Sequence, residues 1–321
     1  MTRDGGRVRA REAFTPRRLR RSAWRRPGSG TVTLATPAVL IGALLVGAPL
    51  LLVIAYSFLS RASGGVGVDT PFTFDAWRRL VFEEDFQGEL VFAPQYLQAL
   101  WRSVWMAALT TFIAVVVAVP TAVWIATRTP RVRALLLLAV TIPFWTNTLI
   151  RTYAWMIMLN DQGVVNNTLR MLGLPPTALY PSVFATFIGL VYVFVPFMIL
   201  PVYTSAMKFD YRLAEAAYDL GATRGRVVRR ILLPSLRPGI LAGSILVFIP
   251  CLGAFVQPTL LGGSKVDLIG TIIQRQFRDS MNWPFGAAIS VALLCVTMMA
   301  LLVFALGAKR LAAQGQRASL V

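Results

Sequence analysis

Several apolar runs longer than 18 residues limit what this chain can fold into more than any other feature. A helix of about 20 residues crosses the hydrocarbon core of a bilayer, whereas core helices of soluble domains are usually shorter. Charged residues make up 14% of the chain, against about 25% in soluble domains. We therefore predict one polytopic membrane domain. Its six predicted spans cover residues 32–59, 97–126, 133–159, 181–207, 238–261 and 285–308.

The formal net charge of +18 is unevenly distributed among the connections between these spans. Ten arginines lie within residues 1–30, and seven basic residues lie within 208–237. By contrast, residues 61–96 hold three basic and six acidic residues. Because basic connections stay on the cytoplasmic side, both termini and the 208–237 connection are predicted to be cytoplasmic. The positive charge then reflects membrane topology, and no nucleic-acid partner is expected.

These boundaries divide the chain into three parts. Residues 1–30 are predicted to form a disordered basic tail, because they contain no apolar span. Residues 31–308 form the membrane domain, and residues 309–321 form a second cytoplasmic tail.

The longest outer connection contains a stretch, Phe74–Leu80, that predicts a short amphipathic helix with Phe74, Trp77 and Leu80 on one face. An acidic run, 83–85, follows it. This region either helps to seat an external partner or is an ordinary solvated loop.

Residues that commonly perform catalysis are scarce. The chain has no histidine, which is the commonest metal ligand and general base. Its two cysteines lie in apolar stretches, where inert buried thiols are expected. No GxxxxGK[ST] phosphate-binding loop is present. We therefore predict a chain that is not an enzyme, binds no metal and does not itself hydrolyse ATP.

The connection 208–237 begins with a predicted helix whose apolar residues Leu213, Ala217 and Leu220 share one face. Gly221 follows, and glycine readily takes the positive φ that closes a helix. Alanines at 214, 216 and 217 leave room for another protein to pack closely.

A second short helix is predicted after this turn. Thr223 is a suitable N-cap, and Val227, Val228, Ile231 and Leu232 form an apolar face. Pro234 and Pro238 are expected to end this helix before the fifth span.

The spacing within this connection is specific. It contains Glu215, Ala216 and Ala217, then three residues, Gly221, nine residues and Ile-x-Leu-Pro ending at Pro234. This pattern resembles the EAA motif of ABC importer permeases. The resemblance implies an all-α, type I importer permease fold, whose cytoplasmic helix-turn-helix inserts into a cleft of an ATPase subunit. It also implies that Glu215, Ala216, Ala217, Gly221 and Pro234 make this coupling contact.

Other segments resemble the spermidine/putrescine permeases. They are Pro143–Trp155, Gly163–Asn167, Pro238–Pro250, Leu260–Gly263 and Asn282–Pro284. This second resemblance implies a bacterial inner-membrane permease subunit for polyamine import. Its implied partners are cytoplasmic ATPase subunits that use ATP and magnesium, a second permease subunit, an extracytoplasmic solute-binding protein, the small-molecule solute and membrane lipid. This chain is expected to bind no cofactor of its own.

Candidate residues for the solute path are polar or aromatic groups at membrane depth. They are Trp145, Asn147, Arg151, Tyr153, Trp155, Asn160 and Asp161. No clear acidic residue lies inside the predicted spans, so selectivity for a polycation is expected to reside in partner chains. Arg151 either has a structural role, paired with Asp161 or bonded to Asn147, or contacts the solute directly.

Three other functions compete with polyamine import. The same importer class could carry an organic anion, an amino-acid derivative or a metal complex, and Arg151 suits an anion. A secondary transporter normally has an internal repeat and intramembrane ionisable groups for ion coupling. A membrane-embedded enzyme would need paired carboxylates or histidines, which the spans lack.

Overall fold

The computed structural model describes residues 29–62, 64, 67–84 and 90–318. Of the tail predicted at 1–30, residues 1–28 lie outside the described residues, and residues 29 and 30 begin a helix. The chain divides into two compact units, 1–50 and 51–321. The described part of the first unit belongs to helix α1, Ser29–Tyr56, which continues into the second unit. Helix α1 is apolar throughout and contains Pro37 and Pro49.

Two short antiparallel hairpins in the connection between α1 and α3 were not predicted. Strand β1, Leu59–Arg61, pairs with β2, Val68–Phe72, and β3, Phe82–Glu84, pairs with β4, Leu90–Phe92. Strands this short give too few alternating positions for a sequence pattern to reveal them.

A short helix between the two hairpins confirms the helix expected near residue 74. Helix α2 covers Asp75–Arg78 and is shorter than predicted. Phe58 fixes the position of α2 through ring contacts. The centroid of the Phe58 ring lies 5.5 Å from that of Phe74 and 5.9 Å from that of Trp77.

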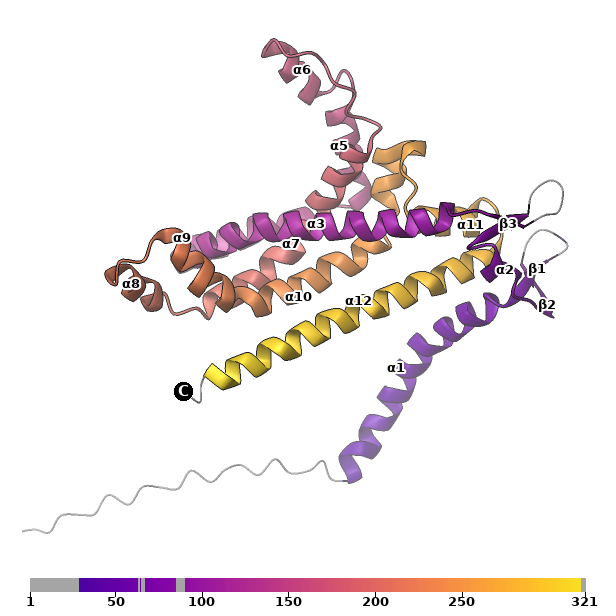
Figure 1. Ribbon diagram of the computed structural model, residues 1–321, viewed down its shortest axis with the longest axis horizontal. Helices are drawn as coiled ribbons and strands as arrows, with labels where there is room; N and C mark the ends of the chain where they lie inside the picture. Colours follow the sequence, from indigo (N-terminus) through magenta and orange to yellow (C-terminus); the bar gives the residue numbers. More distant parts are fainter. Residues whose placement is uncertain (1–28, 63, 65–66, 85–89, 319–321) are drawn as a thin grey trace, which may run out of the picture. The chain divides into compact units, whose positions relative to one another are not determined.

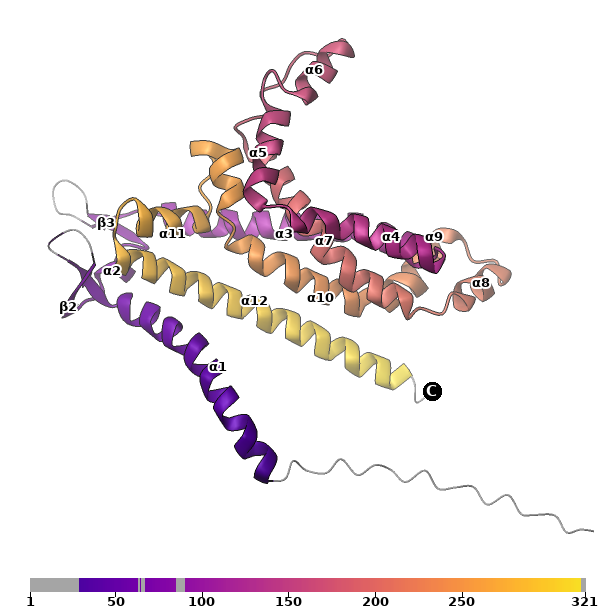
Figure 2. The ribbon, with the colours of Figure 1, turned by 180° about the vertical axis from the view of Figure 1, so that it is seen from behind.

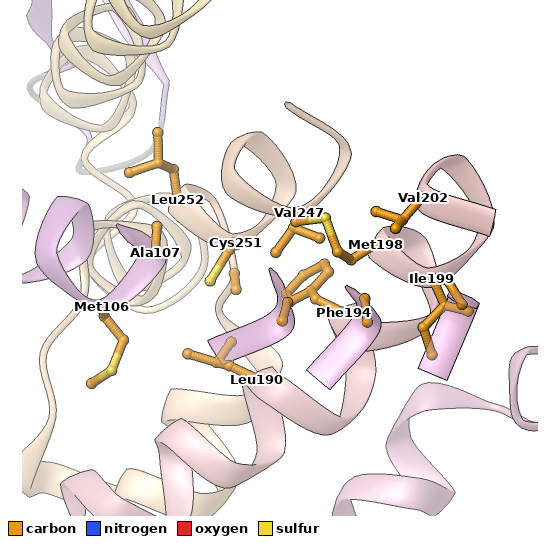
Figure 3. Packing of buried hydrophobic residues seen from close by; sticks show 14 of the residues in the cluster. Met106, Ala107, Leu190, Phe194, Met198, Ile199, Val202, Val247, Cys251 and Leu252 are labelled. Atoms are coloured by element: carbon orange, nitrogen blue, oxygen red, sulfur yellow. The ribbon is translucent and has the colours of Figure 1, made fainter. Parts of the chain in front are cut away.

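Three long helices form the core of the second unit. Figures 1 and 2 show α3, Gln95–Ala126, lying alongside α7, Val183–Met207, and α10, Leu233–Leu252. Helix α3 contributes a row of fully buried alanines, which lets the helix axes approach closely. Larger side chains from α7 and α10 fill the space that remains, as Figure 3 shows for Phe194, Met198 and Val247.

Glycines set the contact between α7 and α10. Gly239 and Gly243 are separated by one helical turn on α10. A Cβ atom on Gly239 would lie 2.5 Å from the backbone oxygen of Pro201, and one on Gly243 would lie 2.5 Å from Sδ of Met198. The two helix backbones can therefore meet only because these positions have no side chain.

The third span, predicted at 133–159, is broken into several helical segments. It consists of α4, Pro130–Thr141, the 3-10 turn η1, Ile142–Trp145, α5, Thr148–Leu159, and α6, Val164–Met171, with a 92° bend between Pro130–Trp145 and Thr148–Met171. Pro143 lacks a backbone donor and interrupts the helical ladder. Asn147 then starts a new helix, because its side chain accepts a hydrogen bond from the Leu149 N–H at 2.8 Å.

The fifth span ends before the predicted boundary at residue 261. Helix α10 ends at Leu252, and the chain then forms a π turn, η3, at Pro258–Gly262 and a 3-10 turn, η4, at Gly263–Lys265. Gly253 and Pro258 both disfavour continued α-helix. The chain returns through α11, Ile269–Arg278, whose first N–H donates to the hydroxyl of Ser103 at 2.8 Å.

Helix α12, Trp283–Ala318, forms the last span and continues past the predicted boundary at residue 308. In the described residues, five helices are long and apolar enough to cross a membrane, and the bent pair that contains α4 and α5 gives up to six. The prediction of six spans agrees with this upper number.

Asn166 holds together the arm formed by α5 and α6. Its side chain is fully buried, and its Nδ2 donates to the carbonyl oxygens of Asn160 and Thr177 at 3.2 and 3.0 Å. Its Oδ1 accepts from the Thr177 N–H at 3.0 Å. The loop after α6 is therefore attached to the turn between α5 and α6 through one side chain.

We expect Asn166→Leu to release this loop, because the Thr177 N–H loses its acceptor and the Asn160 and Thr177 carbonyls each lose one of two bonds. The expected cost is about 1–3 kcal/mol. Hydrogen exchange should show loss of protection at the Thr177 amide. Asn167→Leu is the matched control, because Asn167 is exposed and makes a single side-chain bond to Gln162. Equal protection in the two variants would contradict this role for Asn166.

Candidate functional site

The predicted coupling helix is present as α8, Arg212–Asp219, and a specific turn closes it. Gly221 has φ +80°, as predicted for this position. The Ala222 N–H donates to the Ala217 carbonyl and the Gly221 N–H donates to the Tyr218 carbonyl, both at 2.9 Å. These two bonds form a Schellman motif, which satisfies carbonyls that would otherwise lack partners at the end of the helix.

Helix α8 presents apolar side chains to solvent. Leu213 is 57% exposed and Leu220 is 89% exposed, and both belong to the face predicted from helical spacing. Glu215 and Ala216 are also exposed, and Ala217 is half-buried. An apolar face on so short a helix is a surface that another protein can cover.

The second helix of the connection does not end where the sequence predicted. Helix α9, Arg224–Val227, continues through the π turn η2, Val228–Leu232, directly into α10. Pro234 and Pro238 therefore lie within the helical rod. The π turn accommodates the missing donor of Pro234, because the Leu233 N–H reaches back to the Val228 carbonyl, five residues earlier.

Thr223 occupies the predicted N-cap position of α9 with an extended backbone, but its side chain makes no capping hydrogen bond. Its carbonyl accepts from the Arg226 and Val227 N–H groups at 2.9 and 3.1 Å. Helix α8 is thus joined to the fifth span by one tight turn and a continuous helix.

The start of α8 lies near the corner between α3 and α4. Arg133 donates from Nη2 to the carbonyls of Ala126 and Arg128, both at 3.0 Å, and so caps the end of α3. Burial raises the pKa of Tyr211, the N-cap of α8, and the positive charge of Arg133 partly lowers it. The Tyr211 hydroxyl therefore stays neutral at physiological pH.

The predicted path residues lie on or beside the bent arm. Trp145 is 80% exposed at the bend, and Tyr153 is 46% exposed on α5. Trp155 contacts Tyr192 of α7 edge-to-face, with ring centroids 5.6 Å apart. Asn160 ends α5 and accepts from the Asp161 N–H at 2.6 Å. Their role in a solute path stays a prediction.

Arg151 does not form the predicted ion pair with Asp161. No such pair occurs within the described residues, and Nη2 of Arg151 donates instead to Oγ1 of Thr148 at 3.1 Å. Asn147 is bonded to Arg151 only through backbone atoms, at 3.2 Å. Nε of Arg151 is buried without a partner in the described part of the chain.

Sequence reasoning missed two features of this site. Tyr192 pairs with Trp155, and only the fold reveals this, because the two residues lie on different helices. Gly239 and Gly243 had a detectable signal, since glycines four residues apart in an apolar helix indicate close helix packing.

The described residues thus combine apolar helices long enough to cross a membrane with a short exposed helix, α8, and comparisons with known proteins place this arrangement in a family. The family model described as "Binding-protein-dependent transport system inner membrane component" matches residues 90–312. The chain belongs to this family and is an ABC importer permease.

Its relatives narrow the class further. It is 41% identical to the spermidine/putrescine transport system permease protein PotB of Haemophilus influenzae, over 80% of this chain and 85% of the relative. It is 40% identical to PotB of Escherichia coli, over 81% of this chain and 91% of the relative. It is 31% identical to the inner membrane ABC transporter permease YdcU of Escherichia coli, over 68% and 75% of the two chains.

Solved structures share the fold. A bacterial ABC transporter that imports the acidic polysaccharide alginate matches with a TM-score of 0.64 and 18% identity, over 87% of this chain and 94% of that chain. The methionine ABC transporter MetNI in an inward-facing conformation matches with a TM-score of 0.51 and 18% identity, over 67% and 95% of the two chains.

Proposed function

We propose that this chain is a permease subunit for the import of polyamines such as spermidine and putrescine. The assignment of polyamines as the solute rests on sequence identity. About two residues in five are identical to those of PotB proteins, over four fifths of the chain. The alignments leave about a fifth of this chain unmatched. The relatives and this chain therefore share nearly the whole membrane domain.

We also propose that α8 docks in a cleft of a cytoplasmic ATPase subunit. Its support is the exposed apolar face of Leu213 and Leu220, next to the EAA residues and closed by Gly221. Because the sequence has no phosphate-binding loop, ATP and magnesium act in the ATPase subunits, and this chain is a non-catalytic component. This arrangement requires cytoplasmic termini, as the distribution of basic residues predicts.

A second permease subunit completes the solute path in this proposal, and an extracytoplasmic binding protein supplies the solute. The support is the exposed apolar face of α5, where Ile150 and Ile157 are 68% and 65% exposed. Such a face at membrane depth packs against lipid or another helix. Aromatic rings beside it, including Trp155 and Tyr192, can attract an organic cation.

The test is uptake of labelled spermidine by proteoliposomes that contain both permease subunits, the ATPase subunits and the binding protein. We expect ATP-dependent uptake that excess unlabelled putrescine suppresses. Omission of ATP should abolish uptake, because the chain has no ion-coupling groups of its own. Uptake that persists without ATP would contradict the ABC mechanism.

A solute screen on the partner binding protein tests the cargo separately. We expect spermidine or putrescine to raise the thermal unfolding midpoint of the binding protein, since a bound ligand stabilises the folded state. Stabilisation by an organic anion but by neither polyamine would refute the polyamine assignment and would favour a solute that pairs with Arg151.

A further inference from the structure

The corner between α3 and α4 concentrates positive charge at one end of the second unit. Arg128, Arg131 and Arg133 lie within six residues, and residues 90–160 contain no aspartate or glutamate. None of these three arginines forms an ion pair with a described residue. Figure 2 shows α8 at the same end of the unit as α4. The corner is therefore cationic, and the described residues supply it with no counter-charge.

Trp124 and Arg128 place this corner at the level of the lipid headgroups. Trp124 is 47% exposed in the last turn of α3, at the end of a candidate membrane span. The guanidinium carbon of Arg128 lies 4.6 Å from the centroid of the Trp124 ring. Tryptophan rings and arginine side chains both favour the boundary between hydrocarbon and water. The charged corner therefore lies where the phosphate groups of a membrane are.

Two side chains in this corner carry hydrogen-bond donors without an acceptor. Arg133 uses Nη2 for the carbonyls of Ala126 and Arg128, but its Nε is buried and has no partner among the described residues. The hydroxyl of Tyr211, at the start of α8, is also buried and unpaired within the described part of the chain. Because buried polar groups are normally paired, these two donors suit an acceptor from another molecule.

Arg133 and Tyr211 are close enough to act on one ligand. Burial raises the pKa of Tyr211 and the positive charge of Arg133 partly lowers it, so the two side chains lie near each other. Asp210 and Glu215 are the acidic residues nearest to Tyr211 along the chain, but both are exposed and neither alters its pKa. Phe209 packs edge-to-face on the Tyr211 ring, with centroids 5.0 Å apart, and holds the ring in place.

A phosphate group matches this set of donors. Guanidinium groups form charge-assisted hydrogen bonds with phosphate oxygens, and a phosphodiester has two such oxygens that can accept from Arg133 and Tyr211 together. Arg128 lies directly beside Arg133, because its carbonyl accepts from Nη2 of Arg133 at 3.0 Å. Basic clusters next to the end of a membrane helix are typical binding sites for anionic lipid headgroups.

We propose that the corner between α3, α4 and the start of α8 binds the phosphate group of an anionic lipid through Arg133, Tyr211 and Arg128. The site consists of residues of this chain alone, so it depends on neither the solute nor its binding protein. Because Tyr211 begins α8, a bound headgroup holds the start of this helix at the membrane surface.

The experiment titrates the purified transporter in a neutral detergent with short-chain phosphatidylglycerol and follows the thermal unfolding midpoint. We expect phosphatidylglycerol to raise the midpoint, because a bound ligand stabilises the folded state. Phosphatidylcholine of the same chain length should raise it much less, since its choline cation offsets the phosphate charge. Tyr211→Phe should increase the half-saturating concentration of phosphatidylglycerol about tenfold, because a hydrogen bond to a charged group is lost.

Arg131→Gln is the matched control on α4. Arg131 is exposed, and it points away from Arg133 because two residues are separated by about 200° around a helix. We expect Arg133→Gln to weaken phosphatidylglycerol binding at least as much as Tyr211→Phe, and Arg131→Gln to change it by about twofold or less. Tyr211→Phe leaves the bonds between Arg133 and α3 in place, so it decides the question if Arg133→Gln fails to fold.

Four results would overturn the proposal. Equal stabilisation by phosphatidylcholine would show that the anion is not recognised, and equal losses in Arg131→Gln and Tyr211→Phe would show a diffuse effect of surface charge. If inorganic phosphate stabilises as well as phosphatidylglycerol, and Tyr211→Phe weakens both alike, the ligand is free phosphate and not a lipid. Loss of ATPase assembly in Tyr211→Phe with unchanged lipid binding would assign the corner to the ATPase subunit. No solute is present, so these results are independent of the polyamine assignment.

Discussion

Replacing Gly239 with leucine should prevent α7 and α10 from packing, while the chain still inserts into the membrane. Even the Cβ atom would lie 2.5 Å from the Pro201 carbonyl oxygen, a backbone atom that cannot move without shifting α7. Overpacking against a backbone costs about 3 kcal/mol or more. Insertion should survive because each apolar helix is stable in lipid before the helices associate.

The measurement is the fraction of purified transporter that remains monodisperse after heating, together with uptake. Gly307→Leu is the matched control, because it places the same side chain on α12, where nothing lies within 4 Å of the added Cβ. We expect Gly239→Leu to lose uptake and thermal stability, and Gly307→Leu to retain both. A Gly239→Leu transporter with wild-type stability would show that the contact between α7 and α10 does not depend on this glycine.

Gly221→Val should uncouple ATP hydrolysis from transport without preventing assembly. Gly221 has φ +80°, a region in which a β-branched side chain is strongly disfavoured, at a cost of about 1–2 kcal/mol. A Cβ at this position meets nothing within 4 Å, so the effect comes from the backbone and not from a collision. The strain opens the Schellman turn, and α8 loses its fixed direction relative to α10.

The experiment compares uptake with the stimulation of ATP hydrolysis by the binding protein. We expect uptake to fall about tenfold, in line with this free-energy cost. Gly221→Asn should retain more activity, because asparagine tolerates the left-handed conformation. Gly225→Val is the control in the same connection, since it has open space and no positive φ. If Gly221→Val and Gly225→Val transport equally well, the turn geometry has no role in coupling.

The broken third span shows what a hydropathy pattern cannot predict. The run 133–159 is apolar enough for one helix, and yet the chain bends by 92° between its two halves. Pro143 alone did not decide this, because several other prolines remain inside helices, including Pro120 and Pro196. The difference is that Asn147 can cap a new helix after the break.

The candidate path residues illustrate a second limit of prediction from the sequence. Polarity at membrane depth selected Arg151 and Asp161, and a pair between the two was one of the alternatives for Arg151. In the structure Arg151 bonds to Thr148, one turn earlier on the same helix. A hydrogen bond within one helical turn, such as that of Arg151 to Thr148, can form in any tertiary arrangement. The closeness of Arg151 and Asp161 in the sequence therefore did not establish a pair between them.

The sequence by itself determined the class of protein, the approximate positions of most spans and the turn at Gly221. Each of these depends on properties that act locally, namely apolar length, helical spacing and the freedom of glycine to adopt a positive φ. Only the tertiary structure decided the bend after α4, the atoms of α7 that Gly239 and Gly243 meet, and the continuous helix through Pro234. These features depend on atoms from segments far apart in the chain, or on a balance between competing backbone bonds, and no local pattern encodes either.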